Sequence, residues 1–197
     1  IPASSTGRAS PRNTRRIARE IRRSIRRGWP TGALKVIDDR GNQRYLTSAE
    51  ESQLRGEIAH AYFIFGVDTK AIRQARYAMG ANRDAAVMGS WAGGLAAWRS
   101  GDFEFAGALF RDLAENEKAF PALRSAGAFW AHRIEMRSGR PKEATRYLQI
   151  AARDLDSFYG VIARAALGQK YDVRFELPDY DSNFINWLSR RPGGQRL

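Results

Sequence analysis

Apolar residues recur every three to four positions along most of the chain, the spacing that gathers them on one face of an α-helix. The first such stripe consists of Ile17, Ile21 and Ile25, on a segment otherwise covered by arginine. A narrow stripe of this kind needs a partner surface, so we predict that Arg15 to Arg27 form a docked helix. Gly28 ends this helix, and a proline two residues later suits the first turn of the next. The pattern therefore opens with a helical hairpin.

The same unit recurs along the chain. Helix-stopping glycines follow one another at intervals of 38, 35 and 38 residues, which is the range of two-helix repeats: Gly28, Gly66, Gly101, Gly139. An alanine stands five residues after each glycine, and its small side chain would let the second helix approach the first: Ala33, Ala71, Ala106, Ala144. A large apolar residue stands three residues before each glycine, where it would plug the groove between successive hairpins: Ile25, Phe63, Trp98, Met136.

The flanks of this repeat differ from it. Residues 1–11 are rich in Ser, Pro and Gly and predict a disordered or extended basic arm. Residues 12–168 form the hairpin region, whose last helix is capped by Ser157 and closed by Gly168. Residues 169–197 predict a loop, then an amphipathic helix from Ser182 to Arg191. Only 173–177 alternates as a strand would, so the expected fold class is all-α, a superhelical stack of antiparallel helical hairpins.

The positive charge of the chain is concentrated at its N-terminal end. Residues 1–27 contain nine arginines and one glutamate, which gives +8 of the total net charge of +12. A clustered positive charge favours a polyanion such as nucleic acid, anionic lipid or an acidic cell-wall polymer, and the alternative is a solvated arm. The arm has no interleaved aromatic residues for stacking on bases, which weighs against nucleic acid.

The sequence lacks the residues for cysteine-dependent sites and for a membrane-spanning helix. The absence of cysteine excludes disulfides and thiolate zinc sites, and it does not place the chain in a compartment. No apolar run approaches the roughly 18 residues that span a bilayer, so no transmembrane helix is expected. The chain begins with Ile1 and has no signal-peptide pattern, so we expect that its natural start lies elsewhere.

The residues that carry catalytic chemistry do not form a recognisable set. His60 and His132 fall inside predicted helices without further ligands, and we interpret each as a satisfied helix-face histidine. No nucleophile elbow or phosphate-binding glycine loop occurs, and Gly93-Gly94 marks close helix packing. Neighbouring carboxylates are explained by capping and by exposed first turns: Asp38-Asp39, Glu50-Glu51, Asp154 and Asp156, Asp179 and Asp181. We therefore assign no catalytic, cofactor-binding or metal-binding residue and expect no cofactor.

The second half of the chain resembles the superhelical part of soluble lytic transglycosylases, over about Met88 to Arg191. The resemblance lies in Phe129-Trp130-Ala131-His132-Arg133, in Ser138-Gly139-Arg140 followed by Ala144, Tyr147-Leu148 and Ala151-Ala152, and above all in the helix from Phe158-Tyr159-Gly160 to Leu167-Gly168. In that family, tandem helical hairpins end in a Phe-Tyr-Gly helix, and further helices lead to a lysozyme-like catalytic domain. Family members cleave the bacterial cell-wall glycan with one glutamate, found in a Glu-Ser segment that precedes a Gly-Leu-Met-Gln-like segment.

This resemblance implies a fragment without the catalytic domain. Glu51-Ser52-Gln53-Leu54 lies in the early hairpins and no Gly-Leu-Met-Gln segment follows, so we interpret it as coincidence. Every carboxylate that we can place falls on a cap, an exposed first turn or a polar loop, where its pKa should stay low. The chain stops at Leu197, where the family would continue.

Two hypotheses result, and both predict the same fold. In the first, the chain is the non-catalytic helical module of a periplasmic lytic transglycosylase, and its partners are peptidoglycan glycan strands and the catalytic domain of the same protein. In the second, it is a tetratricopeptide-like scaffold that holds a protein partner on a concave face. Nucleic-acid binding by the arm ranks third.

Overall fold

In the computed structural model, residues 11–170 and 181–191 are described, and they contain helices and no strand. The order is α1 (Pro11–Arg26), α2 (Pro30–Asp38), α3 (Arg40–Gln43), α4 (Ser48–Ile64), α5 (Asp68–Ala81), the 3-10 turn η1 (Arg83–Ala85), α6 (Val87–Arg99), α7 (Phe103–Glu115), α8 (Pro121–Arg137), α9 (Pro141–Ala151), α10 (Phe158–Ala166) and α11 (Ser182–Ser189). The all-α prediction is confirmed. The predicted arm at residues 1–11 lies outside the described part except for Pro11, which begins α1, and so does the 173–177 segment.

The predicted turns occur where the glycines stand. Gly28, Gly66, Gly101 and Gly139 have φ between 68° and 82°, a left-handed conformation that only glycine adopts without strain. At Gly66, the N–H donates to the carbonyl of Phe63, and the next N–H donates to the carbonyl of Tyr62. The same two bonds recur at the other three turns and at Gly168, so each first helix of a hairpin ends in a Schellman motif.

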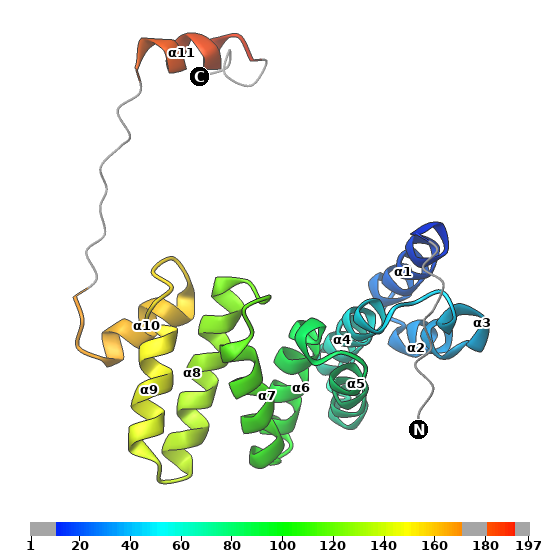
Figure 1. Ribbon diagram of the computed structural model, residues 1–197, viewed down its shortest axis with the longest axis horizontal. Helices are drawn as coiled ribbons and strands as arrows, with labels where there is room; N and C mark the ends of the chain where they lie inside the picture. Colours follow the sequence, from blue (N-terminus) through cyan, green and yellow to red (C-terminus); the bar gives the residue numbers. More distant parts are fainter. Residues whose placement is uncertain (1–10, 171–180, 192–197) are drawn as a thin grey trace.

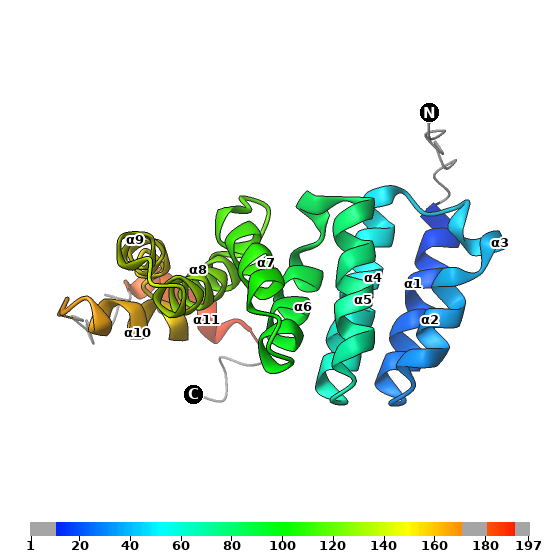
Figure 2. The ribbon, with the colours of Figure 1, turned by 90° about the horizontal axis from the view of Figure 1, so that it is seen from below.

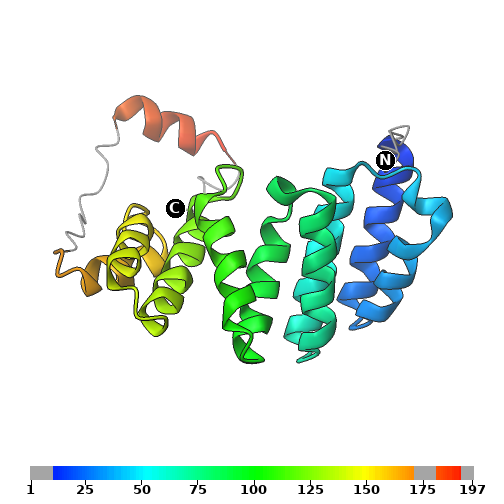
Figure 3. The same ribbon diagram turned by 60° about the horizontal axis from the view of Figure 1, so that its bottom comes forward.

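The helical pairs from α1–α2 to α8–α9 succeed one another in chain order along the long axis, with α3 at the outer end beside α2 (Figure 1). Short glycine turns make the helices antiparallel within the pairs α1–α2, α4–α5, α6–α7 and α8–α9, and each pair packs on the next (Figures 2 and 3). The alanines predicted to lie at the helix contacts are fully buried: Ala33, Ala71, Ala106, Ala144. Paired glycines behave similarly in α6, because a Cβ on Gly93 would lie 2.3 Å from the Cβ of Ala75.

The large apolar residues that stand three positions before the turn glycines are covered only where a further hairpin packs against them. Phe63 is covered by the guanidinium of Arg99 from the next pair, at 4.5 Å from its ring centroid. Trp98 is covered in the same way by Trp130, whose ring centroid lies 5.2 Å away. The prediction for Met136 was wrong, since its side chain is 55% exposed. The short single helix α10 follows it instead of a fifth hairpin, and no equivalent of Arg99 or Trp130 is supplied by the described residues.

Local signals start the helices as the sequence suggests. Thr47 and Glu50 form a reciprocal capping box at α4, in which the Glu50 N–H donates to Thr47 Oγ1 and the Thr47 N–H donates to Glu50 Oε2. Asp102, Ser157 and Asp181 accept bonds at the starts of α7, α10 and α11. The last of these helices ends at Ser189, two residues before the predicted end.

Replacing Ala106 with Leu should lower the free energy of unfolding by about 1 to 3 kcal/mol, because the added atoms must enter a closed helix contact. The exposed Ala165 in α10 is the matched control, and Ala165→Leu should change stability by less than about 0.5 kcal/mol. Urea unfolding followed by circular dichroism measures both. Equal stability of the Ala106 variant and the wild type would show that the hairpin contact is assigned wrongly.

Docking of α1 can be tested at Ile21, which is fully buried in the apolar cluster that α1 shares with α2, α4 and α5. Ile21→Asp buries an unpaired carboxylate and should destabilise α1 by at least about 3 kcal/mol. Hydrogen exchange should then be fast in α1 while α8 and α9 keep their protection. The exposed neighbour Arg19→Asp is the control, and α1 protection in both variants would contradict docking through the isoleucine stripe.

Candidate functional site

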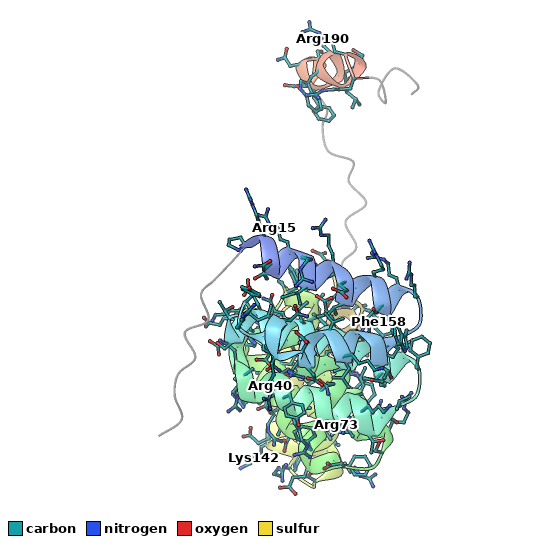
Figure 4. The ribbon with its side chains drawn as sticks, turned by 90° about the vertical axis from the view of Figure 1, so that its right-hand side faces the viewer. Arg15, Arg40, Arg73, Lys142, Phe158 and Arg190 are labelled. Carbon is teal, nitrogen blue, oxygen red and sulfur yellow. The ribbon has the colours of Figure 1, made fainter. Side chains whose placement is uncertain are left out.

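A polar hollow of about 470 Å³ lies where α2 and α3 meet α4 and α5. Its walls carry amide, guanidinium, carboxylate and phenol groups, with Leu34 as one apolar side chain among them: Asp38, Arg40, Gln43, Arg55, Arg73, Gln74, Tyr77. On α5, Tyr77 lies beside both Arg73 and Gln74, because they stand four and three residues before it. Figure 4 shows Arg40 and Arg73, from two different helices, on the end of the molecule that faces the viewer.

Arg55 holds the polar side chains of this hollow in place through hydrogen bonds. Its side chain is 6% exposed, and each nitrogen of its guanidinium is bound: Nε to Glu51 at 2.7 Å, Nη1 to Gln74 at 2.9 Å and Nη2 to Asp38 at 3.0 Å. The guanidinium also lies 5.0 Å from the ring centroid of Tyr77. A buried cation with three partners holds the surrounding side chains in one geometry before any ligand arrives.

The groups on the walls suit a polar, uncharged or weakly acidic ligand. Arg40, Arg73 and Gln43 are exposed and offer donors, while Asp38 and Gln43 can accept. Tyr77 adds an exposed aromatic ring with an apolar face. Hydroxyl groups and ring faces of a sugar match this mixture, and the groups do not form a nucleophile with an adjacent base.

A second hollow, of about 520 Å³, has a different character. It lies between the start of α4, the η1 turn and the start of α8, and apolar side chains form much of its lining: Ala49, Ala85, Val87, Met88, Phe120, Leu123. Phe120 is largely exposed at its rim, where Lys118 Nζ also binds Asp84 at 2.8 Å. A hollow of this kind favours an apolar side chain or a short helix.

The carboxylates singled out in the sequence come together only around Arg55. Asp38 and Glu51, taken from two separate carboxylate pairs, both bind its guanidinium, which gives Glu51 a structural role. Ser52, next to Glu51, is fully buried and donates to the carbonyls of Ala78 and Asn82. Asp179 lies outside the described residues. Sequence reasoning missed Arg55 and Gln74, although an arginine inside the apolar face of α4 was a signal.

The histidines lie apart from both hollows. His132 Nδ1 is 2.9 Å from the Ala144 carbonyl, which satisfies it within the hairpin. His60 is half-buried, and loss of solvent lowers its pKa, so it stays neutral near pH 7. Among residues 11–170 and 181–191, no three or more His, Asp and Glu side chains gather as a metal site would require.

One carboxylate contradicts the expectation that all of them lie at caps, first turns or loops. Glu135 lies in the packed region of α8, and its side chain is 3% exposed. Burial alone would raise the pKa of Glu135, but hydrogen bonds from Arg140 and Arg111 outweigh burial and lower the pKa overall. A general acid for glycan cleavage needs the opposite shift, so Glu135 is a structural ion-pair centre between α7, α8 and the Gly139 turn.

Comparisons with known proteins identify no relative: no protein-family model, curated protein or solved structure matches the chain. Among the helices in residues 11–170 and 181–191, none combines the length and the apolar character that a membrane span requires.

Glu135→Gln should lower the free energy of unfolding by about 2 kcal/mol near pH 7, because it leaves Arg111 and Arg140 without their carboxylate. The folded-state pKa of Glu135 lies below its unfolded value, so its contribution is present above about pH 4.3 and is lost as the pH falls through the folded pKa. The stability difference between variant and wild type should therefore shrink below about pH 4. Glu143→Gln removes an exposed ion pair with Arg146 and should cost no more than about 0.5 kcal/mol at any pH.

Proposed function

We propose that this chain is a non-catalytic helical-hairpin module that holds a strand of bacterial peptidoglycan, as the superhelical part of a periplasmic lytic transglycosylase would. The hairpins then form a solenoid whose first turns carry the binding site. Cleavage belongs to a separate catalytic domain of the same protein, and this module positions the polymer or docks that domain.

The polar hollow around Arg55 is the observation that carries the proposal. Its rigid carboxylate and amide groups, exposed arginines and exposed aromatic ring can bind hydroxyls, N-acetyl carbonyls and a sugar face at once. The stem peptides of peptidoglycan carry carboxylates, and the positive charge of the chain favours their approach.

The buried carboxylate supports the non-catalytic part of the proposal. Glu135 is the most buried acid among the described residues, yet two arginines hold it in its charged form. Glu51 is engaged by Arg55, so neither residue is arranged to protonate a glycosidic oxygen.

Binding to purified sacculi tests the proposal. Arg73→Gln combined with Tyr77→Ala should weaken binding about tenfold, because both side chains are exposed on the hollow. Lys142→Gln combined with Phe158→Ala removes the same charge and one exposed ring at the opposite end and is the matched control. Equal binding by the two double variants would contradict a glycan site at the hollow.

The same sacculi provide a test of activity. The chain as given should release no anhydro-muropeptides, whereas a longer chain continued into a lysozyme-like domain should release them. If this chain releases anhydro-muropeptides and Glu51→Gln abolishes the release, the chain is itself the enzyme and the non-catalytic proposal is wrong.

The second candidate is a tetratricopeptide-like scaffold, and the apolar hollow beside Phe120 favours it. A peptide helix could place one or two apolar side chains between Met88 and Leu123. In that case Phe120→Ala, and not the Tyr77 double variant, would abolish capture of a specific protein partner.

A further inference from the structure

The outward face of α1 carries a straight row of arginines. Their spacing of three and four residues places them opposite the buried Ile17 and Ile21, and the row extends over about 21 Å of helix: Arg12, Arg15, Arg19, Arg23, Arg26. All five are exposed. Because α1 is the first helix of the stack, no further hairpin of the described chain covers this face, and Figure 4 shows Arg15 directed away from the body.

The row is left without acidic partners. Arg16 pairs with Glu20 and Arg22 with Glu57, and both of these pairs lie on the flanks of the row. Within the described residues, none of the five row arginines lies in an ion pair, and the only side-chain bond among them is from Arg19 Nε to the Arg15 carbonyl at 3.3 Å. Five adjacent guanidinium groups repel one another, so this arrangement gains free energy when a negatively charged surface approaches.

Exposed apolar side chains lie at the end of the same helix. Trp29 is 55% exposed, Ile64 is 64% exposed and Phe65 is 53% exposed. The Phe65 ring comes within 3.4 Å of the position of a Cβ on Gly28, so the α4–α5 turn brings it to the α1–α2 turn. We call Trp29, Ile64 and Phe65 the apolar edge. It lies directly beyond Arg26 and Arg27, at the C-terminal end of α1.

We propose that the arginine row and the apolar edge together dock the protein on the surface of an anionic phospholipid bilayer. The arginines lie over phosphate groups, and the indole of Trp29 with the neighbouring apolar side chains enters the headgroup region. The isoleucine stripe of α1 stays in the protein core, so the helix rests on the bilayer without inserting. This inference is independent of the glycan site, which lies on other residues.

The apolar edge selects a bilayer among polyanions. Phosphates of duplex DNA would satisfy the row but leave three large apolar side chains in water. Single-stranded nucleic acid would need aromatic rings between the arginines, and the row contains none. An acidic cell-wall polymer offers charge and no apolar phase. Only a lipid surface matches both features side by side.

Partitioning of the full chain onto vesicles tests the proposal. Vesicles of phosphatidylglycerol mixed with phosphatidylcholine should bind the wild type at about 0.15 M salt, and pure phosphatidylcholine should not. The triple variant Arg19→Gln, Arg23→Gln, Arg26→Gln should lower the partition coefficient about 100-fold, since each arginine near the surface contributes about fivefold. The remote triple variant Lys142→Gln, Arg153→Gln, Lys170→Gln loses the same charge and should lower it less than about threefold.

Contact with the bilayer is measured separately through Trp29. Brominated lipid should quench part of the tryptophan fluorescence of the wild type, and Trp29→Phe should keep binding but lose that quenching. Absence of binding to the anionic vesicles, an equal loss in the two triple variants, or unchanged quenching in Trp29→Phe would each overturn the proposal. Retention of duplex DNA in place of vesicles would do so as well and would indicate nucleic acid. Binding to sacculi by the arginine-row variant stays a separate readout of the glycan site.

Discussion

The arrangement depends on one backbone conformation that L side chains rarely adopt. At each of four positions the chain leaves a helix through a glycine with a positive φ, and the two bonds of the Schellman motif fix the direction of the next segment. The second helix is thereby turned back along the first at a short distance, where only a small side chain fits. The alanines are buried as a result of this turn, because a larger side chain would push the helices apart. Spacing of the glycines then sets how long each hairpin is and where its neighbour packs.

These local signals are the part of the fold that sequence reasoning predicts well. Gly101 with Asp102 specifies a helix end and a helix start within two residues, and the structure places both there. Met136 shows the limit of the approach. Its repeat position suggested burial, but burial depends on a neighbour that supplies a covering side chain, and α10 is too short to do so. Residues that act through long-range contacts cannot be assigned from spacing alone.

The candidate site shows the same limit more strongly. The sequence pointed to Asp38 and Glu51 because they are carboxylates with acidic neighbours. The residue that binds both is Arg55, which lies in α4, a helix whose sequence pattern predicted a buried face. No role followed for Glu135 from the sequence pattern, and in the structure it is buried, where Arg111 of α7 and Arg140 of the following turn compensate its charge. Buried ions need partners, and partners distant in sequence are visible only in three dimensions. For Arg55 and for Glu135, the sequence feature that could have predicted a buried ion pair was a charged residue among the apolar residues of a helix.

The packing between successive hairpins has a consequence for how the molecule unfolds. Most of the buried apolar residues fall into two clusters, one over α1 to α5 and one over α7 to α10. Helix α6 contributes Ala96 to the first and Ala97 to the second, and its Trp91, Leu95 and Trp98 pack against the second. The buried residues of α6 are all glycine, alanine or serine, which lets its backbone pack closely against α4, α5 and α7. Unfolding of linear arrays spreads from one unit to its neighbours, and its cooperativity depends on the weakest boundary. The packing of α1 and α2 against α4 is sparser than the packing of α4 and α5 against α6, so under mild denaturant α1 and α2 should lose their protected amides before the other helices do.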